Sequence, residues 1–252
     1  MYYRNGNFEI YYEKYGDSKE TILILPGWGF TRPTFYPLIN SLSKNYTVYI
    51  VDYPGFGKSS FKEYDLTIYD YASAFRELML ELKIEEPIII AHSFGGRITT
   101  LLSGYYKDNI KKLILIDTAG IKPKTTLKKL IRKYTYKFLK KLTNLLPKKK
   151  RKKVKNYLLK KYSSQDYYDL PDNVKKTFQN IVNEDLTKYL KEINTETLII
   201  WGERDTSTPL KDAYKMNKEI KDSGLIVFKG ASHYAYLDYP YLTLNIIEAF
   251  LK

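Results

Sequence analysis

The residues best suited to covalent chemistry lie in the segment 91–95, which reads Ala-His-Ser-Phe-Gly. Its serine, Ser93, follows the apolar run 87–90 and precedes a segment with a helical pattern. A serine between small residues at a strand-to-helix turn is typical of a nucleophile elbow, whose strained backbone holds the hydroxyl clear of the sheet. The following helix would aim its N-terminal N–H groups at the same point. Ala91 stands where glycine is usual, and its small side chain still permits the turn.

A nucleophilic serine needs a base and a carboxylate that orients the base. The chain has two histidines. His92 adjoins the serine and is expected to point away from it, as a packed polar residue beside the elbow. His233, in Gly-Ala-Ser-His after the strand-like run 225–228, is therefore the expected base. Asp205, after the strand-like run 198–201, is the expected acid.

Two other carboxylates compete with Asp205 for the role of the acid. Glu203 lies two residues earlier, and Asp117 ends an earlier predicted strand. Both are expected to serve loop hydrogen bonds or ion pairs instead. The chain order Ser93, Asp205, His233 is the order that this nucleophile motif predicts.

Two further loops carry a resemblance to the α/β-hydrolase family that runs nearly from end to end. The segment 25–29, Leu-Pro-Gly-Trp-Gly, is similar to the family's oxyanion loop, with Pro26 in the place of a histidine. The segment 52–59 matches the family's Asp-x-Pro-Gly-x-Gly-x-Ser loop. The resemblance implies that the backbone N–H groups of Trp28 and Phe94 form the oxyanion hole. Pro26 leaves that hole intact but removes a side-chain hydrogen bond that often braces the loop.

Alternating strand and helix patterns predict an α/β fold with a mainly parallel sheet. The first two predicted strands are close enough to form an antiparallel hairpin. Thr67 and Asp70 are spaced as a capping box at the start of a long helix. The predicted strands are 8–12, 21–25, 46–51, 87–91, 113–117, 197–201 and 225–228.

The family resemblance gives these elements an architecture. It implies a seven- or eight-stranded α/β-hydrolase sheet flanked by helices, with a core formed by residues 1–120 and 196–252. Residues 121–195 are predicted to form a helical cap inserted after the sixth strand of the family core. Such a cap roofs the active site, so its apolar residues Leu127 and Tyr134 are expected, with Trp28 and Phe94, to line the substrate pocket.

Composition restricts the other functions open to the chain. Cysteine is absent and both histidines are already assigned, so no metal and no other cofactor is expected. The N-terminal residues lack a signal-peptide layout and no apolar run would span a bilayer, so a cytoplasmic location is the default expectation.

The net charge of +14 is concentrated in one region. Residues 122–161 hold 18 of the 42 Lys and Arg and no acidic residue, which leaves 24 basic against 28 acidic residues elsewhere. Three interpretations stay open: a solvated face, a docking site for an acidic protein such as an acyl carrier, or attachment to an anionic membrane surface. Nucleic acid is not expected, because no binding module is recognisable.

The sequence therefore predicts a serine hydrolase that cleaves carboxylic esters of small molecules through an acyl-enzyme on Ser93. Three alternatives remain: a C–C bond hydrolase of the same fold, an esterase acting on carrier-linked acyl chains, and a receptor that keeps the triad only to bind. Arg97, two residues past the elbow, either binds a substrate carboxylate or pairs with an internal acid.

Overall fold

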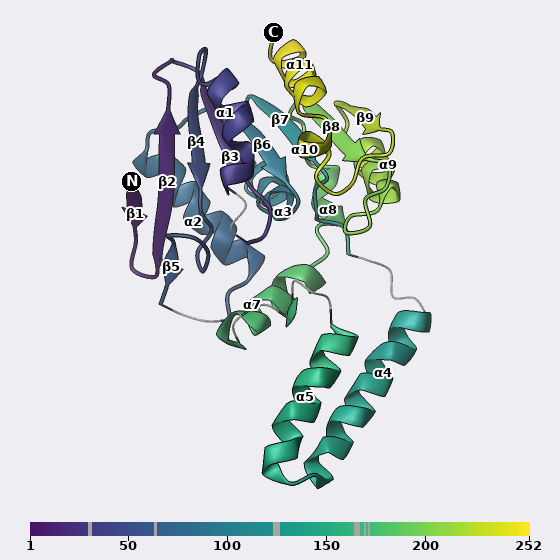
Figure 1. Ribbon diagram of the computed structural model, residues 1–252. Helices are drawn as coiled ribbons and strands as arrows, with labels where there is room; N and C mark the ends of the chain where they lie inside the picture. The colour runs from purple at the N-terminus through teal and green to yellow at the C-terminus, as the bar shows by residue number, and fades with distance from the viewer. Residues whose placement is uncertain (30–31, 63–64, 123–126, 164–166, 169, 171) are drawn as a thin grey trace.

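A central sheet with helices on both faces forms the body of the molecule, and a helical hairpin extends from it (Figure 1). The computed structural model describes residues 1–29, 32–62, 65–122, 127–163, 167–168, 170 and 172–252, with backbone alone at 128, 129, 148, 172 and 173. The strands are β1 (Tyr2–Arg4), β2 (Phe8–Tyr15), β3 (Thr21–Leu25), β4 (Thr47–Val51), β5 (Ser60–Phe61), β6 (Ile88–His92), β7 (Lys112–Ile116), β8 (Thr197–Gly202) and β9 (Ser223–Phe228).

The strands run in the order β1-β2-β4-β3-β6-β7-β8-β9, with β5 paired to β2 outside this path. The pairs β1·β2, β2·β4 and β2·β5 are antiparallel, and every pair from β4 to β9 is parallel. The mostly parallel sheet expected from the sequence is thus present.

The expected hairpin between the first two predicted strands is wrong. β2 pairs with β4, at Tyr12 opposite Val51, and β3 lies between β4 and β6. The reason is burial, since residues 22–25 of β3 are all apolar and all buried. A strand that is apolar on both faces belongs in the sheet interior with a parallel neighbour on each side. The short strands β1 and β5 were not predicted.

Alternate residues of the interior strands point to opposite faces of the sheet and pack into two separate hydrophobic cores. Leu23, Ile89 and Ala91 pack with helices α2, α3 and α9, whereas Ile24 and Ile90 pack with α1 and α11. The helices of the body are α1 (Tyr36–Leu42), α2 (Ile68–Glu81), α3 (Phe94–Thr100), α8 (Thr187–Leu190), α9 (Leu210–Glu219), α10 (Ala235–Asp238) and α11 (Pro240–Leu251), with a 3-10 turn η1 (Arg32–Phe35) and a π-helical turn η2 (Leu101–Tyr105). The predicted capping box at Thr67 and Asp70 is confirmed at the start of α2.

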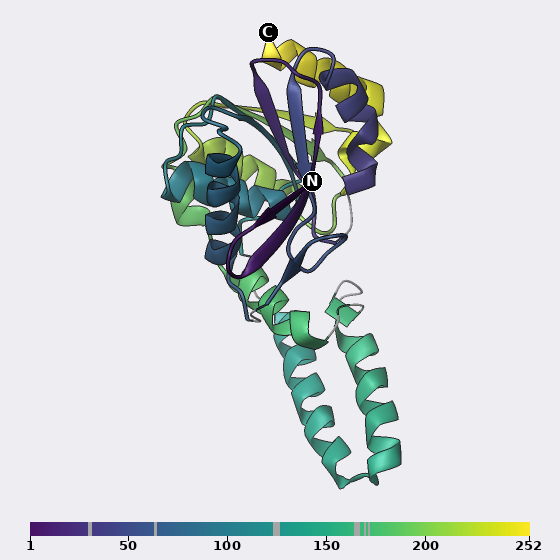
Figure 2. The same cartoon turned by 90° about the vertical axis from the view of Figure 1, so that its left-hand side faces the viewer.

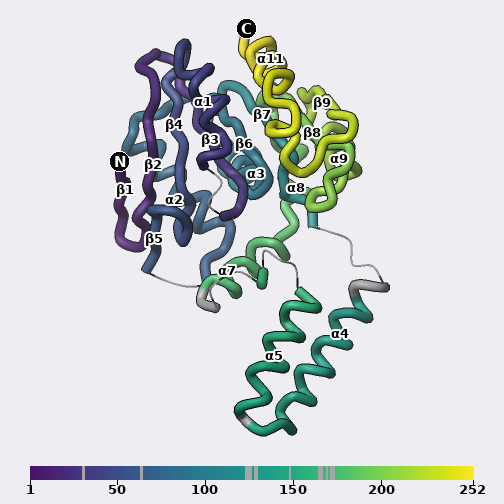
Figure 3. The backbone as a smooth tube through the Cα atoms, viewed as in Figure 1, coloured from purple at the N-terminus to yellow at the C-terminus, as the bar shows by residue number. Residues whose placement is uncertain are grey.

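Between β7 and β8 the chain forms the basic hairpin, which consists of α4 (Leu127–Leu142), the 3-10 turn η3 (Thr143–Leu145) and α5 (Lys148–Tyr162). Helix α7 (Asp172–Asn183) follows it and lies between the hairpin and the body. The hairpin projects away from the sheet in two perpendicular views (Figure 2), and the backbone trace shows α4 and α5 side by side (Figure 3). Within the hairpin, α4 packs on α5 through Tyr136 and Tyr162, whose ring centroids are 5.9 Å apart.

Candidate active site

Ser93 lies at the junction of β6 and α3, where the backbone is strained. Its φ of 47° and ψ of −109° are unfavourable for a residue with a side chain. The turn brings α3 against β3 so closely that a Cβ on Gly95 would lie 2.1 Å from the backbone oxygen of Leu25. Only glycine fits there, which explains the small residue of the motif and gives Ser93 the geometry of a nucleophile elbow.

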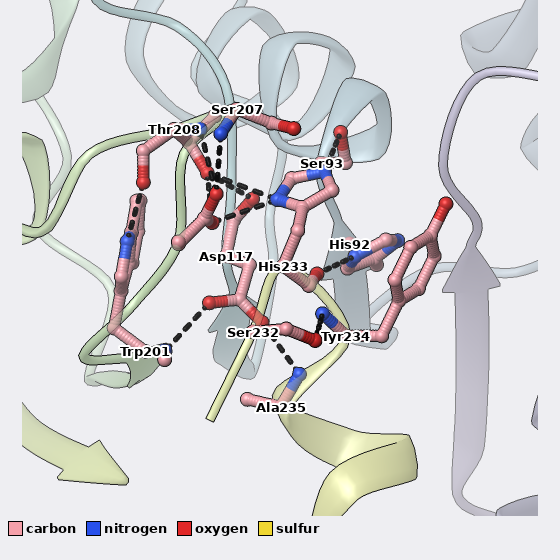
Figure 4. Close-up of polar contacts among 12 residues, drawn as sticks. His92, Ser93, Asp117, Trp201, Ser207, Thr208, Ser232, His233, Tyr234 and Ala235 are labelled. Atoms are coloured by element: carbon pink, nitrogen blue, oxygen red, sulfur yellow. Dashed lines mark hydrogen bonds and ion pairs between the residues drawn. The ribbon is translucent and has the colours of Figure 1, made fainter. Parts of the chain in front are cut away.

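The three residues of the predicted triad meet at the carboxyl ends of β6, β8 and β9. His233 Nε2 lies 3.0 Å from Ser93 Oγ, and His233 Nδ1 lies 2.7 Å from Asp205 Oδ2. Figure 4 shows the imidazole between the serine hydroxyl and the turn that carries Ser207 and Thr208. An ionised Asp205 selects the tautomer with a proton on Nδ1, which leaves Nε2 free to accept the serine proton.

Asp205 is held as a carboxylate by the loop that follows β8. Burial alone would raise its pKa, but hydrogen bonds from His233 and Thr208 outweigh burial and lower the pKa. Oδ1 accepts the backbone N–H of Ser207 at 2.7 Å and of Thr208 at 2.9 Å, and the Thr208 hydroxyl donates to Oδ2 at 2.6 Å. Thr208 had no sequence signal of its own, because a threonine three residues after an aspartate is common in any turn.

The competing carboxylates have structural partners instead. Asp117 is fully buried at the end of β7, where its two oxygens accept the backbone N–H groups of Gly202 at 2.7 Å and Ala235 at 3.0 Å. Burial raises the pKa of Asp117 to about 7. Glu203 accepts the backbone N–H of Gly230 at 2.8 Å. Asp117 therefore links the segments that carry Asp205 and His233. This agrees with the expectation that Asp117 serves hydrogen bonds in loops.

The loop with Trp28 packs directly on the elbow. The backbone N–H of Gly95 donates to the carbonyl oxygen of Pro26 at 3.1 Å, which places the Trp28 and Phe94 segments side by side. The buried hydroxyl of Tyr53 donates to the same oxygen at 2.9 Å. Tyr53 therefore supplies a brace for the loop in which Pro26 replaces histidine. Its position just after β4 gave no indication of this contact.

His92 points away from Ser93, as expected, and is buried. Its Nε2 donates to the backbone carbonyl oxygen of His233 at 2.9 Å, and burial lowers its pKa to about 3. The imidazole is therefore neutral at ordinary pH. Gly27 packs on its other side, where an added Cβ would lie 2.8 Å from Nδ1.

A cavity of about 430 Å³ opens beside Ser93 and His233. Trp28 and Phe94 line it, as predicted, with their ring centroids 4.8 Å apart. The roof comes from Phe178, Ile181 and Val182 of α7. Arg97 also lines this cavity.

Leu127 and Tyr134, which were predicted to line the substrate pocket, do not line this cavity. They lie on α4 with 74% and 60% of their surface exposed. The hairpin packs on itself through the other side of α4, so its outer face contacts neither cavity nor core among the described residues. Helical periodicity predicts an apolar face but not the element that covers it, which is why this expectation was wrong.

The part of the chain that the structure describes shows neither a metal-binding cluster nor a membrane-spanning helix. In it, no three His, Asp or Glu residues gather in a way that would hold a metal ion. None of its helices has both the length and the apolar character needed to cross a bilayer.

Comparison with known proteins agrees with this geometry. A family model described as alpha/beta hydrolase fold matches residues 20–240. The chain is 28% identical to a pimeloyl-[acyl-carrier protein] methyl ester esterase of Wigglesworthia glossinidia brevipalpis, over 94% of this chain and 95% of that protein. It is 26% identical to a 2-hydroxy-6-oxononadienedioate/2-hydroxy-6-oxononatrienedioate hydrolase of Pseudomonas putida, over 91% and 87%. The crystal structure of an enol-lactonase from Burkholderia xenovorans superposes with a TM-score of 0.75 at 20% identity, covering 100% of this chain and 99% of that one.

Proposed function

Because the chain belongs to the alpha/beta hydrolase fold family and is a hydrolase, we propose that it cleaves carboxylic esters through an acyl-enzyme formed on Ser93. The observation that carries this proposal is the continuous chain of contacts from Ser93 Oγ through His233 to Asp205, with separations of 3.0 and 2.7 Å. A hydroxyl, an imidazole and a carboxylate in this order form a proton-relay unit that activates the hydroxyl.

In the proposed mechanism His233 takes the proton of Ser93 as the hydroxyl oxygen attacks the acyl carbon. Asp205 stabilises the imidazolium that forms. The backbone N–H groups of Trp28 and Phe94 hold the oxyanion of the tetrahedral intermediate, each contributing about 3 kcal/mol. His233 then protonates the leaving alcohol and activates a water molecule, which releases the acid and restores Ser93.

A fluorophosphonate probe tests the nucleophile, and p-nitrophenyl esters of graded chain length test the reaction. We expect one covalent adduct on Ser93 that is absent from Ser93→Ala. Ser207→Ala, which removes another serine hydroxyl of the cavity lining, should retain the label. An unlabelled Ser93 in a folded protein that still binds ligands would contradict the enzyme and favour a receptor that keeps the triad.

The names of two relatives supply alternative substrates for the same residues. One is named for a methyl ester on an acyl carrier and the other for hydrolysis of 2-hydroxy-6-oxononadienedioate and 2-hydroxy-6-oxononatrienedioate. Both reactions can use a serine, a histidine and an aspartate in this geometry. Turnover of a ring-cleavage dienoate at a higher kcat/KM than any ester in the panel would replace the ester proposal with C–C hydrolysis.

We further propose that the basic hairpin docks on an anionic lipid surface. Its helix α4 exposes a stripe of large apolar side chains at helical spacing: Leu127, Leu130, Ile131, Tyr134, Phe138 and Leu142. The surrounding segment 122–161 carries 18 positive and no negative side chains. An amphipathic helix with a dense basic surface fits a membrane interface, where the apolar face enters the headgroup boundary and lysines contact lipid phosphates.

An acidic protein is the other candidate occupant, and the apolar stripe favours the bilayer. Charge alone would satisfy a docking site for a soluble acidic carrier, but it would leave these apolar side chains exposed to water. The hairpin precedes α7 in the chain, and α7 lies between the hairpin and the body and lines the cavity. A cytoplasmic location stays a prediction.

Vesicle sedimentation tests the docking proposal. The full chain should pellet with vesicles containing phosphatidylglycerol at low salt, and should stay in solution with phosphatidylcholine alone. The triple variant Ile131→Ser, Tyr134→Ser and Phe138→Ser should lose binding, whereas Leu80→Ser with Tyr241→Ser, exposed on the body, should not. Failure to pellet with anionic vesicles would contradict the proposal. Binding to an acidic carrier protein without binding to vesicles would also contradict it. So would a dimer in light scattering that the triple variant converts to a monomer, because the stripe would then be covered by a second copy.

A further inference from the structure

Arg97 is a charged side chain buried inside the proposed ester site. It lies on α3 one turn after Ser93, so both residues share a face of the helix. The residue lines the cavity and is only 4% exposed. A buried guanidinium is costly unless its charge and its N–H groups are matched, so its partners indicate what the site is built to hold.

Among the described residues, Arg97 has one hydrogen-bond acceptor. Nη1 donates to the backbone carbonyl oxygen of Glu184 at 3.0 Å. Among the described residues, no carboxylate lies within ion-pair distance of the guanidinium. A guanidinium has five N–H donors and no acceptor, so one carbonyl leaves most of its capacity unused.

The acidic side chains nearest to Arg97 are engaged elsewhere. The Asp185 carboxylate accepts the backbone N–H and the hydroxyl of Thr187 at 3.1 and 2.6 Å. The Glu184 carboxylate accepts the hydroxyl of Tyr69 at 3.2 Å. Their charges act on Arg97 from a distance, and burial still lowers its pKa to about 10. Arg97 is therefore a cation at neutral pH without a carboxylate in contact.

The remainder of the lining suits a short apolar chain that ends in an acceptor group. Ile121, Phe178, Ile181 and Val182 contribute apolar side chains to the lining. The indole N–H of Trp28, another lining residue, is buried without an acceptor among the described residues. Asp212 also lines the cavity, but the charges that act on it are those of Lys211, Lys215 and Asp205 rather than Arg97.

We propose that Arg97 binds a free carboxylate of the substrate, so that the preferred substrates are esters that carry a second, unesterified acid group. The proposal rests on the proposed ester hydrolysis at Ser93. A carboxylate matches the planar fork of a guanidinium with two parallel hydrogen bonds. The bond that breaks is the ester bond near Ser93, where water yields an alcohol and an acid. The carboxylate at Arg97 is unchanged by the reaction.

Matched substrates test the proposal and locate the acid group. Monomethyl glutarate is compared with dimethyl glutarate, which has the same skeleton without the charge. The monomethyl esters of succinate, adipate and pimelate measure the span from Ser93 to Arg97. An acid on the leaving group is tested with 4-acetoxybutyrate against butyl acetate. We expect kcat/KM to be about 30-fold higher for the charged member of one of these pairs, as a charge-assisted hydrogen bond typically gives.

Arg97 variants assign that preference to the guanidinium. Arg97→Met should lower kcat/KM for the charged ester to that for the neutral ester, while turnover of the neutral ester persists. Arg97→Lys, which keeps the charge but loses the fork, should retain only part of the preference. Lys218→Gln removes one exposed positive charge away from the cavity and should leave the ratio unchanged.

Binding to the inactive protein separates this proposal from the proposed function. Glutarate should bind Ser93→Ala in calorimetry, and the double variant with Arg97→Met should lose that binding. Equal turnover of charged and neutral esters by the native chain would overturn the role of Arg97, as would a preference that survives Arg97→Met. Absence of ester hydrolysis together with Arg97-dependent glutarate binding would overturn only the ester reaction. If Arg97→Met does not fold, the same comparisons are decided by Arg97→Lys.

Discussion

The imidazole of His92 donates from Nε2 to the backbone carbonyl oxygen of His233, over 2.9 Å. The residue that precedes the nucleophile therefore holds the loop that presents the base. Because His92 and Ser93 are consecutive, a movement of the elbow is transmitted directly to the position of His233. His92 is a positioning residue in this geometry, although its ring does not touch Ser93 Oγ.

The first prediction concerns the pH dependence of stability that His92 imposes. Its pKa is about 3 in the folded chain, against about 6.5 when exposed, so the unfolded chain binds a proton that the folded chain excludes. The stabilisation is complete above pH 6.5 and is lost as the pH falls toward 3. At pH 5 this loss amounts to about 2 kcal/mol. Urea unfolding at pH 7 and pH 5 measures it.

His92→Gln serves as the variant for this measurement, since it keeps an N–H donor but cannot titrate. The free energy of unfolding of His92→Gln should fall less between pH 7 and pH 5, by about 2 kcal/mol, than that of the native chain. Activity provides a second readout. His92→Leu, without a donor, should lose about tenfold in kcat relative to His92→Gln. Equal pH slopes in the two proteins would contradict a buried, neutral His92.

Short motifs in the sequence predict the three residues that the structure brings into contact. Ser93, Asp205 and His233 each follow a strand-like run, and parallel strands end at one edge of the sheet, so strand order alone brings the residues close. The strand pairing was harder to predict, because sequence proximity suggested that β2 and β3 pair. The continuous apolar run of β3 was the better signal, since it required a neighbour on both sides.

The contacts that support the triad were beyond sequence reasoning for a different reason. Thr208, Tyr53 and His92 act through hydrogen bonds whose partners are determined by tertiary packing rather than by spacing. The exposure of Leu127 and Tyr134 is likewise determined by tertiary packing. An amphipathic pattern specifies which side of α4 is apolar, and only the packing of α5 decides which residues remain uncovered.

The second prediction distinguishes the two buried carboxylates. Asp205→Asn should lower kcat by about 10⁴, because a neutral amide no longer favours the productive tautomer of His233. Asp117→Asn should keep kcat within about tenfold but reduce the free energy of unfolding by about 2 kcal/mol, since one backbone N–H loses its acceptor. Steady-state kinetics and urea unfolding of both variants provide the comparison.

The direction in which stability changes with pH gives a further check on the roles of Asp117 and Asp205. A folded pKa of about 7 lies above the unfolded value, so the native chain loses stability as the pH rises from about 4 to 7. Asp117→Asn removes this titration. The deficit of Asp117→Asn relative to the native chain should therefore be larger near pH 4 than at pH 8. A larger kinetic loss in Asp117→Asn than in Asp205→Asn would reverse the assignment of the acid.

The third prediction concerns the brace on the loop that carries Trp28. Tyr53→Phe removes the hydroxyl that donates to Pro26 and should cost about 1 kcal/mol of stability and about tenfold in kcat. Tyr71→Phe is a matched control, because its buried hydroxyl donates to the carbonyl oxygen of Pro54 at 3.0 Å. The control should lose similar stability and keep its kcat. Equal kinetic losses in both variants would show that Tyr53 has no special relation to the loop that carries Trp28.

The fourth prediction tests the close approach that makes the elbow. In Gly95→Ala the new Cβ would lie 2.1 Å from the backbone oxygen of Leu25, so α3 must move away from β3. We expect a loss of about 3 kcal/mol, which lowers Tm by about 10 °C, together with the loss of fluorophosphonate labelling at Ser93. Gly224→Ala, on β9, is the control, because nothing lies within 4 Å of its added Cβ. That variant should keep its labelling rate and gain slightly in stability, since alanine is favoured over glycine in a strand. Normal labelling and an unchanged Tm in Gly95→Ala would mean that Ser93 does not depend on this turn for its position.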